Sequence, residues 1–442
     1  MLIFLHGRLT ITTINKILSA VAMYKGLHRN IYYVALARMI LGMGNFIIPF
    51  LVLLFTDKLG YSASLAGTLA MSITGLYLLG SFIGGKLSDW VGHKNTMVAG
   101  ECVGAILLLM CGFAPDAPVM VPALLFAAYF FIGVALPASN ALVADLSHAG
   151  NRDAVMSLSY LAYNLGSAMG PILAGYLFWQ HTEWIFFGNG LAVLVGILVV
   201  AFLVNVTEQA VPESDSDLER AVEGSVWSVL KSRPYLIVFT LFCGMLWFAL
   251  NQMTMASPLY LSHLFGQEGP VRFGQLMTYA CVLVVIITPL LLRATSGHTE
   301  TMALAYAGLL FVLGYGLVML VPTIPVHFLA WFFLSAGEVL VLTKEGVYLA
   351  NNSPASHRGR IQGVLITLRS LLLMPSFVLI GYVIDTFGYS VTWSLVIAMA
   401  MCASIGMLFY RCGRKHAPQR RRHKIDGFVT HADSSSMRLK VG

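Results

Sequence analysis

Long apolar segments follow one another along almost the whole chain, separated by short polar stretches. A helix that crosses a membrane needs about 20 mostly apolar residues, and about twelve segments meet that requirement. Backbone groups in lipid must bond to one another, so such segments form helices or closed barrels. The segments lack the alternation of apolar and polar residues that is typical of strands in a membrane barrel. We therefore predict an all-α membrane protein with transmembrane helices at 31–56, 62–84, 96–115, 119–146, 154–178, 184–205, 233–262, 271–293, 300–321, 326–352, 360–384 and 389–411.

The composition excludes a soluble globular protein. Hydrophobic residues make up 58% of the chain and charged residues only 11%, whereas soluble domains carry roughly 25% charged residues. The six cysteines are scattered without a C-x-x-C pair. We therefore expect neither a disulfide framework nor a metal site, and no cofactor is predicted.

A polar stretch divides the predicted spans into two sets of six. It runs from about Thr207 to Arg233 and carries six acidic residues. Similar short segments follow the fourth and the tenth span, where Ala144–Arg152 and Ala350–Arg358 share Ala, Ser, Ala and Arg at identical offsets. Repeats of six spans are typical of transporters. We predict bundles at 31–206 and 233–411, joined by a linker at 207–232.

Basic residues in the short loops predict the orientation. One set of loops is rich in Lys and Arg, whereas the opposite set holds little beyond Lys58 and Arg272. The basic side faces the cytoplasm, which places an extension at 1–30 and a basic tail at 412–442 inside the cell. Ala20–Ala22 resembles a signal cleavage site, but we favour an uncleaved extension. We expect the tail to contact anionic lipid rather than nucleic acid.

The segment between the second and third spans carries the spacing G-x-x-x-D-x-x-G-x-K, formed by Gly85, Asp89, Gly92 and Lys94. This motif resembles the loop between spans two and three of the major facilitator superfamily. The resemblance implies twelve helices in two pseudo-symmetric bundles that expose a cavity to each side of the membrane in turn. It also implies that Asp89 contacts the start of span 11, near Arg358 and Arg360, as a latch of the outward-open state.

A second motif lies on span 5, where Gly166, Gly170, Pro171 and Gly175 form G-x-x-x-G-P-x-x-x-G. It is similar to a motif of the proton-driven antiporters of that superfamily. Close helix packing is the alternative interpretation, since small residues let neighbouring helices approach. Those antiporters also carry an Arg in span 4, and Tyr129 stands at the matching position here. We therefore expect no proton relay built on that Arg.

Ionisable residues inside spans usually face a cavity or a partner. The candidates for proton coupling are Glu338, Glu345, Arg38 and Arg369, and Glu338 is preferred because it lies near the middle of span 10. The alternative is a permanent ion pair of Glu338 with Arg369 or Arg38. Glu101 and Lys344 are expected to reach the membrane interface.

Uncharged polar and aromatic residues inside the spans are candidates to line a substrate cavity, although any one of them could instead join helices. The group on span 7 is the most suggestive, because it places an aromatic ring and an amide one turn apart. The candidates are Asn45, Asn140, Tyr160, Tyr163, Asn164, Trp247, Asn251 and Gln252.

The chain contains no catalytic or nucleotide-binding motif that we recognise, so we predict a transporter driven by a proton gradient rather than an enzyme. The favoured function is proton-coupled efflux of amphipathic or drug-like molecules by a monomer in the inner membrane. Symport, or specific export of a metabolite, peptide or lipid, stays an alternative. A sensor or scaffold that transports nothing is the alternative from another class.

Overall fold

The computed structural model describes residues 24–147, 151–205, 233–352 and 358–415, and these residues form helices and turns without a strand. Nine helical stretches in this part are long and apolar enough to cross a membrane. Two of them, Pro234–Ala294 and Gly363–Tyr410, each cross twice. The broken helix over 152–177 supplies one more crossing, so the prediction of twelve transmembrane helices is confirmed.

Six crossings form the N-terminal half. The first and the fifth each consist of two helices, because the chain leaves helical geometry at residues 44–46 and at 168–169. The helices are α2 (Arg29–Met43), α3 (Ile47–Leu53) with the π-turn η1 (Leu54–Lys58), α4 (Ala63–Val91), α5 (His93–Phe113), α6 (Met120–Asp145), α7 (Arg152–Ser167), α8 (Gly170–Leu177) and α9 (Thr182–Leu203).

The C-terminal half repeats the pattern, and its first crossing is also broken, at residues 252–255. Its last two crossings form one long element with a kink at Gly388, where φ is 76°. The elements are α11 (Pro234–Asn251), α12 (Ala256–Phe265), η2 (Gly266–Glu268), α13 (Gly269–Ala294), α14 (Glu300–Leu320), α15 (Ile324–Asn352) and α16 (Arg358–Lys415).

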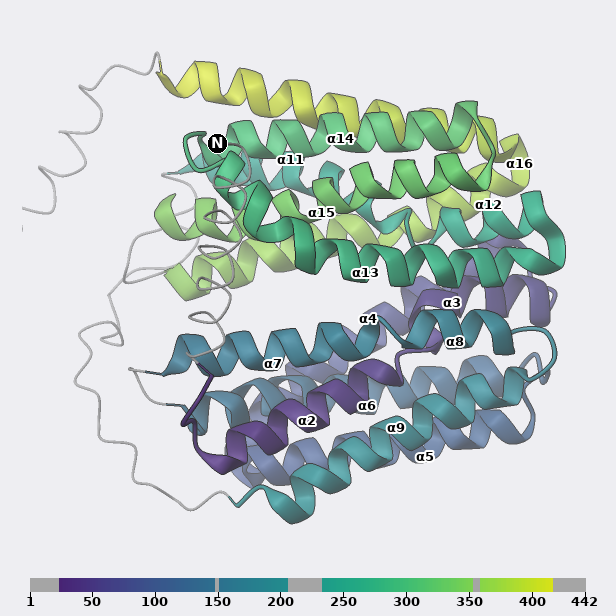
Figure 1. Ribbon diagram of the computed structural model, residues 1–442, viewed down its shortest axis with the longest axis vertical. Coiled ribbons are helices and arrows are strands. Elements are labelled where there is room, and N and C mark those ends of the chain that lie inside the picture. Colours follow the sequence, from purple (N-terminus) through teal and green to yellow (C-terminus); the bar gives the residue numbers. More distant parts are fainter. Residues whose placement is uncertain (1–23, 148–150, 206–232, 353–357, 416–442) are drawn as a thin grey trace, which may run out of the picture.

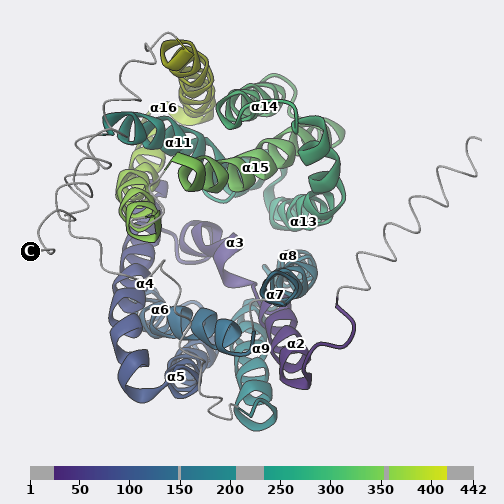
Figure 2. The same cartoon turned by 90° about the vertical axis from the view of Figure 1, so that its left-hand side faces the viewer.

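The two halves lie side by side with their helices roughly parallel (Figure 1). The end of the bundle where α2 begins and α16 ends is called the terminal end below, and the opposite end the far end. Figure 2 views the molecule onto the terminal end. The predicted extension at 1–30, linker at 207–232 and tail at 412–442 fall mostly outside the described residues, so these boundaries stay predictions.

The turn between the second and third spans is shorter than the motif suggested. Helix α4 continues to Val91, so Gly85 and Asp89 lie on a helix rather than in a loop. Only Gly92 turns the chain, with φ of 92° and ψ of 148°, a conformation that glycine adopts without strain. The predicted end of span 2 at residue 84 was therefore wrong by two helical turns.

Glycines let the halves approach closely toward the far end. A Cβ atom at Gly67 of α4 would overlap the carbonyl oxygen of Phe377 on α16, and one at Gly381 would overlap that of Ala63. Helices α8 and α13 meet in the same way through Gly175 and Gly274. Backbone-to-backbone packing of this kind holds membrane helices together where no hydrophobic effect acts.

Gly166 offers a test of this packing within the N-terminal half. A Cβ atom there would overlap the carbonyl oxygen of Met39 on α2. We expect Gly166→Ala to destabilise the protein by about 1–3 kcal/mol, since overpacking forces the backbone to shift. Gly244→Ala is the matched control, because a Cβ there meets nothing within 4 Å. Thermal unfolding in detergent measures both, and equal melting temperatures would contradict the prediction.

Candidate functional site

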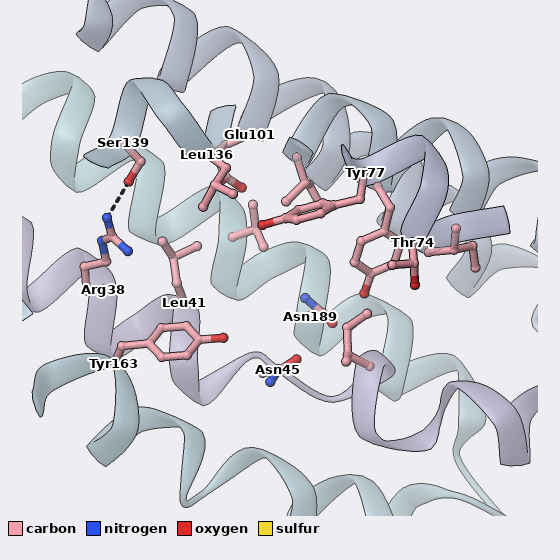
Figure 3. A pocket seen from close by; sticks show the side chains of 15 residues that line it. Arg38, Leu41, Asn45, Thr74, Tyr77, Glu101, Leu136, Ser139, Tyr163 and Asn189 are labelled. Carbon is pink, nitrogen blue, oxygen red and sulfur yellow. Dashed lines mark hydrogen bonds between the residues drawn. The ribbon is translucent and has the colours of Figure 1, made fainter. Parts of the chain in front are cut away.

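Side chains of the N-terminal half line a half-open cavity of about 520 Å³. Figure 3 shows Tyr77, Tyr163, Asn45 and Asn189 directed toward its centre, with Arg38 at one end. Six of the lining residues are Leu, Ile or Val, so its walls combine apolar surface with polar groups. The polar and aromatic lining residues are Arg38, Asn45, Thr74, Tyr77, Glu101, Tyr129, Ser139, Tyr163 and Asn189.

Arg38 of α2 is held against α6 by neutral acceptors. Its Nη2 donates to Ser139 Oγ at 2.9 Å and to Asn140 Oδ1 at 3.1 Å. Its Nε is buried and has no acceptor among the described residues. Thus the position of Arg38 is fixed, and within the described part of the chain it makes no ion-pair contact with a carboxylate. The suggested pairing with Glu338 was therefore wrong.

Glu101 of α5 also lines this cavity, and only 8% of the residue is exposed. The expectation that it reaches the membrane interface was wrong. Helix α5 packs against both α6 and α9, which turns this side chain toward the interior. Gly100 and Gly104 flank it and meet α6 closely, and this small-residue spacing is the sequence signal that could have located it.

A break in the first span adds backbone groups to the cavity region. Helix α2 ends at Met43, and α3 begins at Ile47. Asn189 of α9 accepts a hydrogen bond from the backbone N–H of Ile47 at 3.3 Å, which satisfies the start of α3. Asn45 lies within the break and lines the cavity. Interrupted helices mark the substrate sites of many secondary transporters.

The charges of the C-terminal half are arranged differently. Arg369 Nη1 donates to Glu345 Oε2 at 2.6 Å. Trp247 Nε1 donates to the same oxygen at 2.7 Å, and the guanidinium of Arg369 lies 4.1 Å from the Trp247 ring centroid. The permanent ion pair suggested for Glu338 is therefore made by Glu345 instead. Charge-assisted bonds and a cation–π contact stabilise this cluster together.

Glu338 is half-buried on α15 and has neither an ion pair nor a hydrogen bond among the described residues. A role in proton transfer stays a prediction for this residue. Lys344 on the same helix is half-buried as well.

The predicted cavity residues separate into groups. Asn45 and Tyr163 line the cavity, and Asn140 binds Arg38 at its end. Tyr160 is 61% exposed and accepts a hydrogen bond at its carbonyl from Asn164 Nδ2 at 2.8 Å.

The span 7 residues lie in the other half, away from this cavity. Trp247 belongs to the ion-pair cluster, and Asn251 ends α11. Gln252 is 0% exposed and donates to the carbonyl oxygen of Phe248, so it does not face a cavity.

The span 5 motif joins helices. Gly166 packs on α2, while Gly170 lies beside Asn45 in the span 1 break. Gly175 packs on α13, and the carbonyl oxygen of Pro171 approaches Gly274 of the other half. The motif therefore packs closely both within its half and between the halves. This agrees with simple helix packing and equally with the resemblance to the antiporter motif.

The structure describes only part of the latch motif. Asp89 is exposed on α4, and the side chains of Arg358 and Arg360 lie outside the described residues. Lys94 Nζ donates to the carbonyl oxygens of Ala201 and Val204 at 2.8 and 2.7 Å. Lys94 therefore binds the C-terminal end of α9, where a cation is favourable, and does not join the latch.

The halves are joined at the far end by bonds that the sequence did not reveal. Asp385 of α16 accepts the backbone N–H of Ala63 at 3.0 Å and that of Ser64 at 2.7 Å. Trp179 donates to the carbonyl oxygen of Gln267 at 2.9 Å, and Ser262 donates to Asp57. These contacts, with the glycine packing beside them, close the bundle at the far end.

Twelve helices in two halves, with charged groups turned inward around a cavity, define a membrane transporter. A family model described as Major Facilitator Superfamily matches residues 34–374. The chain therefore belongs to the major facilitator superfamily.

Curated relatives from bacteria match most of the chain at low identity. A Na(+), Li(+), K(+)/H(+) antiporter of Planococcus maritimus is 24% identical over 347 residues, 71% of this chain and 80% of the relative. The transporter YttB of Bacillus subtilis is 22% identical over 387 residues, 85% of this chain and 95% of the relative. The multidrug resistance protein MdtH of Edwardsiella ictaluri is 23% identical over 261 residues, 58% and 62% of the two chains.

Solved structures agree in fold. A nucleoside transporter, NupG, superposes with a TM-score of 0.73 at 13% identity, over 87% of this chain and 99% of that chain. An auto-inhibited peptide transporter of the POT family gives 0.71 at 15% identity, over 88% and 98%. At such identity the likeness concerns the fold alone.

Arg369 offers a test of the C-terminal cluster. Its side chain is 13% exposed and that of Glu345 only 7%. We expect Arg369→Ala to destabilise the protein by about 3–5 kcal/mol, because removing one partner leaves the other charge buried alone. Adding Glu345→Gln to the same chain should restore part of that loss. Thermal unfolding measures both variants, and strictly additive losses would contradict the pairing.

Proposed function

We propose that this protein exports amphipathic small molecules in exchange for protons, and that Glu101 is the group for which the two compete. The supporting observation is the placement of a buried carboxyl group in the wall of a cavity with aromatic and aliphatic surface. A proton and a cationic group of a ligand cannot occupy one carboxylate together. Binding of either releases the other, and this competition gives antiport.

The closed far end supports alternating access as the mechanism. The halves make their backbone contacts and hydrogen bonds at that end, while the loops at the terminal end carry most of the Lys and Arg. With the basic side in the cytoplasm, this structure corresponds to an inward-facing state of a plasma-membrane protein with both termini inside. A proton gradient is the energy source.

The names of two relatives agree with this proposal. One is named a Na(+), Li(+), K(+)/H(+) antiporter and another a multidrug resistance protein. Glu338, which has no partner among the described residues, is the second proton-binding group in the proposal.

Flux into proteoliposomes tests the exchange. Vesicles with an acidic lumen should accumulate a cationic fluorescent amphiphile such as ethidium, because outward proton flow drives its inward transport. Glu101→Gln should abolish this accumulation, since an amide cannot take up the proton. Fluorescence in the lumen is measured before and after the gradient is dissipated with an ionophore.

Glu268→Gln is the control, because that carboxyl group is exposed at the far end and pairs with Arg272, away from the cavity. It should transport like the unmodified protein. Accumulation driven by the opposite gradient would indicate symport and overturn the proposal. So would a Glu101→Gln variant with unchanged gradient-driven uptake.

A further inference from the structure

We propose that the cavity binds a zwitterionic amphiphile, with an oxyanion of the ligand on Arg38 and its ammonium group on Glu101. This inference rests on the proposed function and names the chemical class of its substrate. It follows from two opposite charges that line one cavity and do not pair with each other.

Arg38 has unused hydrogen-bonding capacity. Only Nη2 of its guanidinium donates to protein acceptors, Ser139 and Asn140. Its Nε is buried without an acceptor among the described residues, and a buried donor without a partner costs free energy. A guanidinium presents its donors in a planar fork that matches the two oxygens of a carboxylate. A ligand carboxylate would satisfy this group.

Glu101 supplies the opposite charge in the same cavity. It lines the wall on α5, and among the described residues it forms no ion pair with Arg38. The two charges act on each other through space but are not in ion-pair contact, so a ligand with a single charge would give a contact partner to only one of them. A ligand with both charges gives each group a contact partner, and a buried charge left without a partner is costly.

The remaining walls select the body of the ligand. Tyr77 and Tyr163 point into the cavity (Figure 3), and Leu41 and Ile132 are among its aliphatic lining. Aromatic rings pack well against aromatic and aliphatic surface. We therefore expect an apolar, preferably aromatic, body that carries an amino group and a carboxylate.

Three probes with the same body test this class: naphthylethylamine, naphthylpropionate and naphthylalanine. Their binding to the purified full-length protein is measured by calorimetry in detergent. We expect naphthylalanine to bind at least about tenfold more tightly than either singly charged probe. Arg38→Gln should reduce its affinity to that of the amine, and Glu101→Gln to that of the carboxylate.

Arg272→Gln is the control, because this arginine lies at the far end and pairs with Glu268. It should leave all three affinities unchanged. Tight binding of the amine alone would overturn the inference of a zwitterionic ligand, but it would leave the proposal of proton-coupled cation export intact. Equal affinities of all three probes, unaffected by Arg38→Gln, would overturn the inference, whereas the ethidium flux decides the proposed function separately.

A second inference comes from the contacts between the halves: we infer that Asp385 is a latch that holds the far end closed. Its two carboxylate oxygens accept the N–H groups of Ala63 and Ser64, the first residues of α4 in the other half. The first N–H groups of a helix have no partner within it, and the helix dipole favours an anion there. One carboxylate thus binds across the interface between the halves.

The geometry of α4 and α16 makes this latch the counterpart of the one predicted at the terminal end. Helix α4 and the first crossing of α16, up to the kink at Gly388, run in opposite directions and pack near the far end. Asp385 lies on α16 just before the kink at Gly388, at the far end of the bundle, and it binds the N-terminus of α4. Asp89 lies near the terminal end of α4, and the N-terminus of α16, at Arg358, is at that same end.

In this structure the far latch is formed, while Asp89 is exposed. Because the halves rock as bodies about the cavity, closing one end opens the other, and the two latches exclude each other. Each carboxylate therefore stabilises one of the two states, and their balance sets the resting population.

Spin labels at the far end test this balance. Asp116→Cys and Val321→Cys place labels on exposed positions of the two halves, in a chain whose native cysteines are replaced. Pulsed electron resonance then gives the populations of the closed and open far end. We expect Asp385→Asn to shift the ratio about tenfold toward open, because the amide lacks the negative charge that the N-terminus of α4 favours.

Asp89→Asn should shift the population the opposite way, and the double variant should return toward the unmodified protein. Asp385→Glu keeps the charge and should stay mostly closed. Glu183→Gln serves as the control, because Glu183 is a half-buried far-end carboxyl group that pairs with His181 of its own half. An unchanged distance distribution in Asp385→Asn, or an equal shift in the control, would overturn the latch.

Discussion

A charge inside a membrane bundle needs either a partner or a polar cavity, and this requirement orders the interior of the protein. The bilayer offers no water to an ionised side chain, so burial without compensation is costly. The C-terminal half meets the requirement by pairing Glu345 with Arg369 and closing the pair with Trp247. The N-terminal half keeps Arg38 and Glu101 apart on the wall of a cavity. The two halves therefore share a fold but differ in chemistry.

This asymmetry suggests a division of work. The half whose charges are not in ion-pair contact is the one that we propose binds the ligand and exchanges a proton. The half with the closed ion pair can move as a rigid body against it. Glycine contacts between α4 and α16, and between α8 and α13, bring backbone against backbone at the far end. Such contacts are either made or lost as a whole, which suits a transition between two discrete states.

The sequence predicted the large features because they depend on local properties. Apolar length alone located twelve helices, and the polar stretch after the sixth marked the two halves. Local geometry was harder to foresee. The motif around Asp89 has the composition of a loop, yet α4 continues through it and turns only at Gly92. Lys94 belongs to the motif by spacing but binds the end of α9 instead.

The sequence by itself determined which residues carry charge within the spans and how far along each span they lie, because helical rise converts position into depth. It could not determine which of them meet. The ion pair of Glu345 with Arg369, the placement of Glu101 beside the Arg38 cavity, and the bond of Asp385 to the start of α4 all join different helices. Only the tertiary structure decided these partners. The depth of a residue in the membrane depends on its position along one helix, whereas contact between two side chains depends on how several helices are rotated and which of them are neighbours.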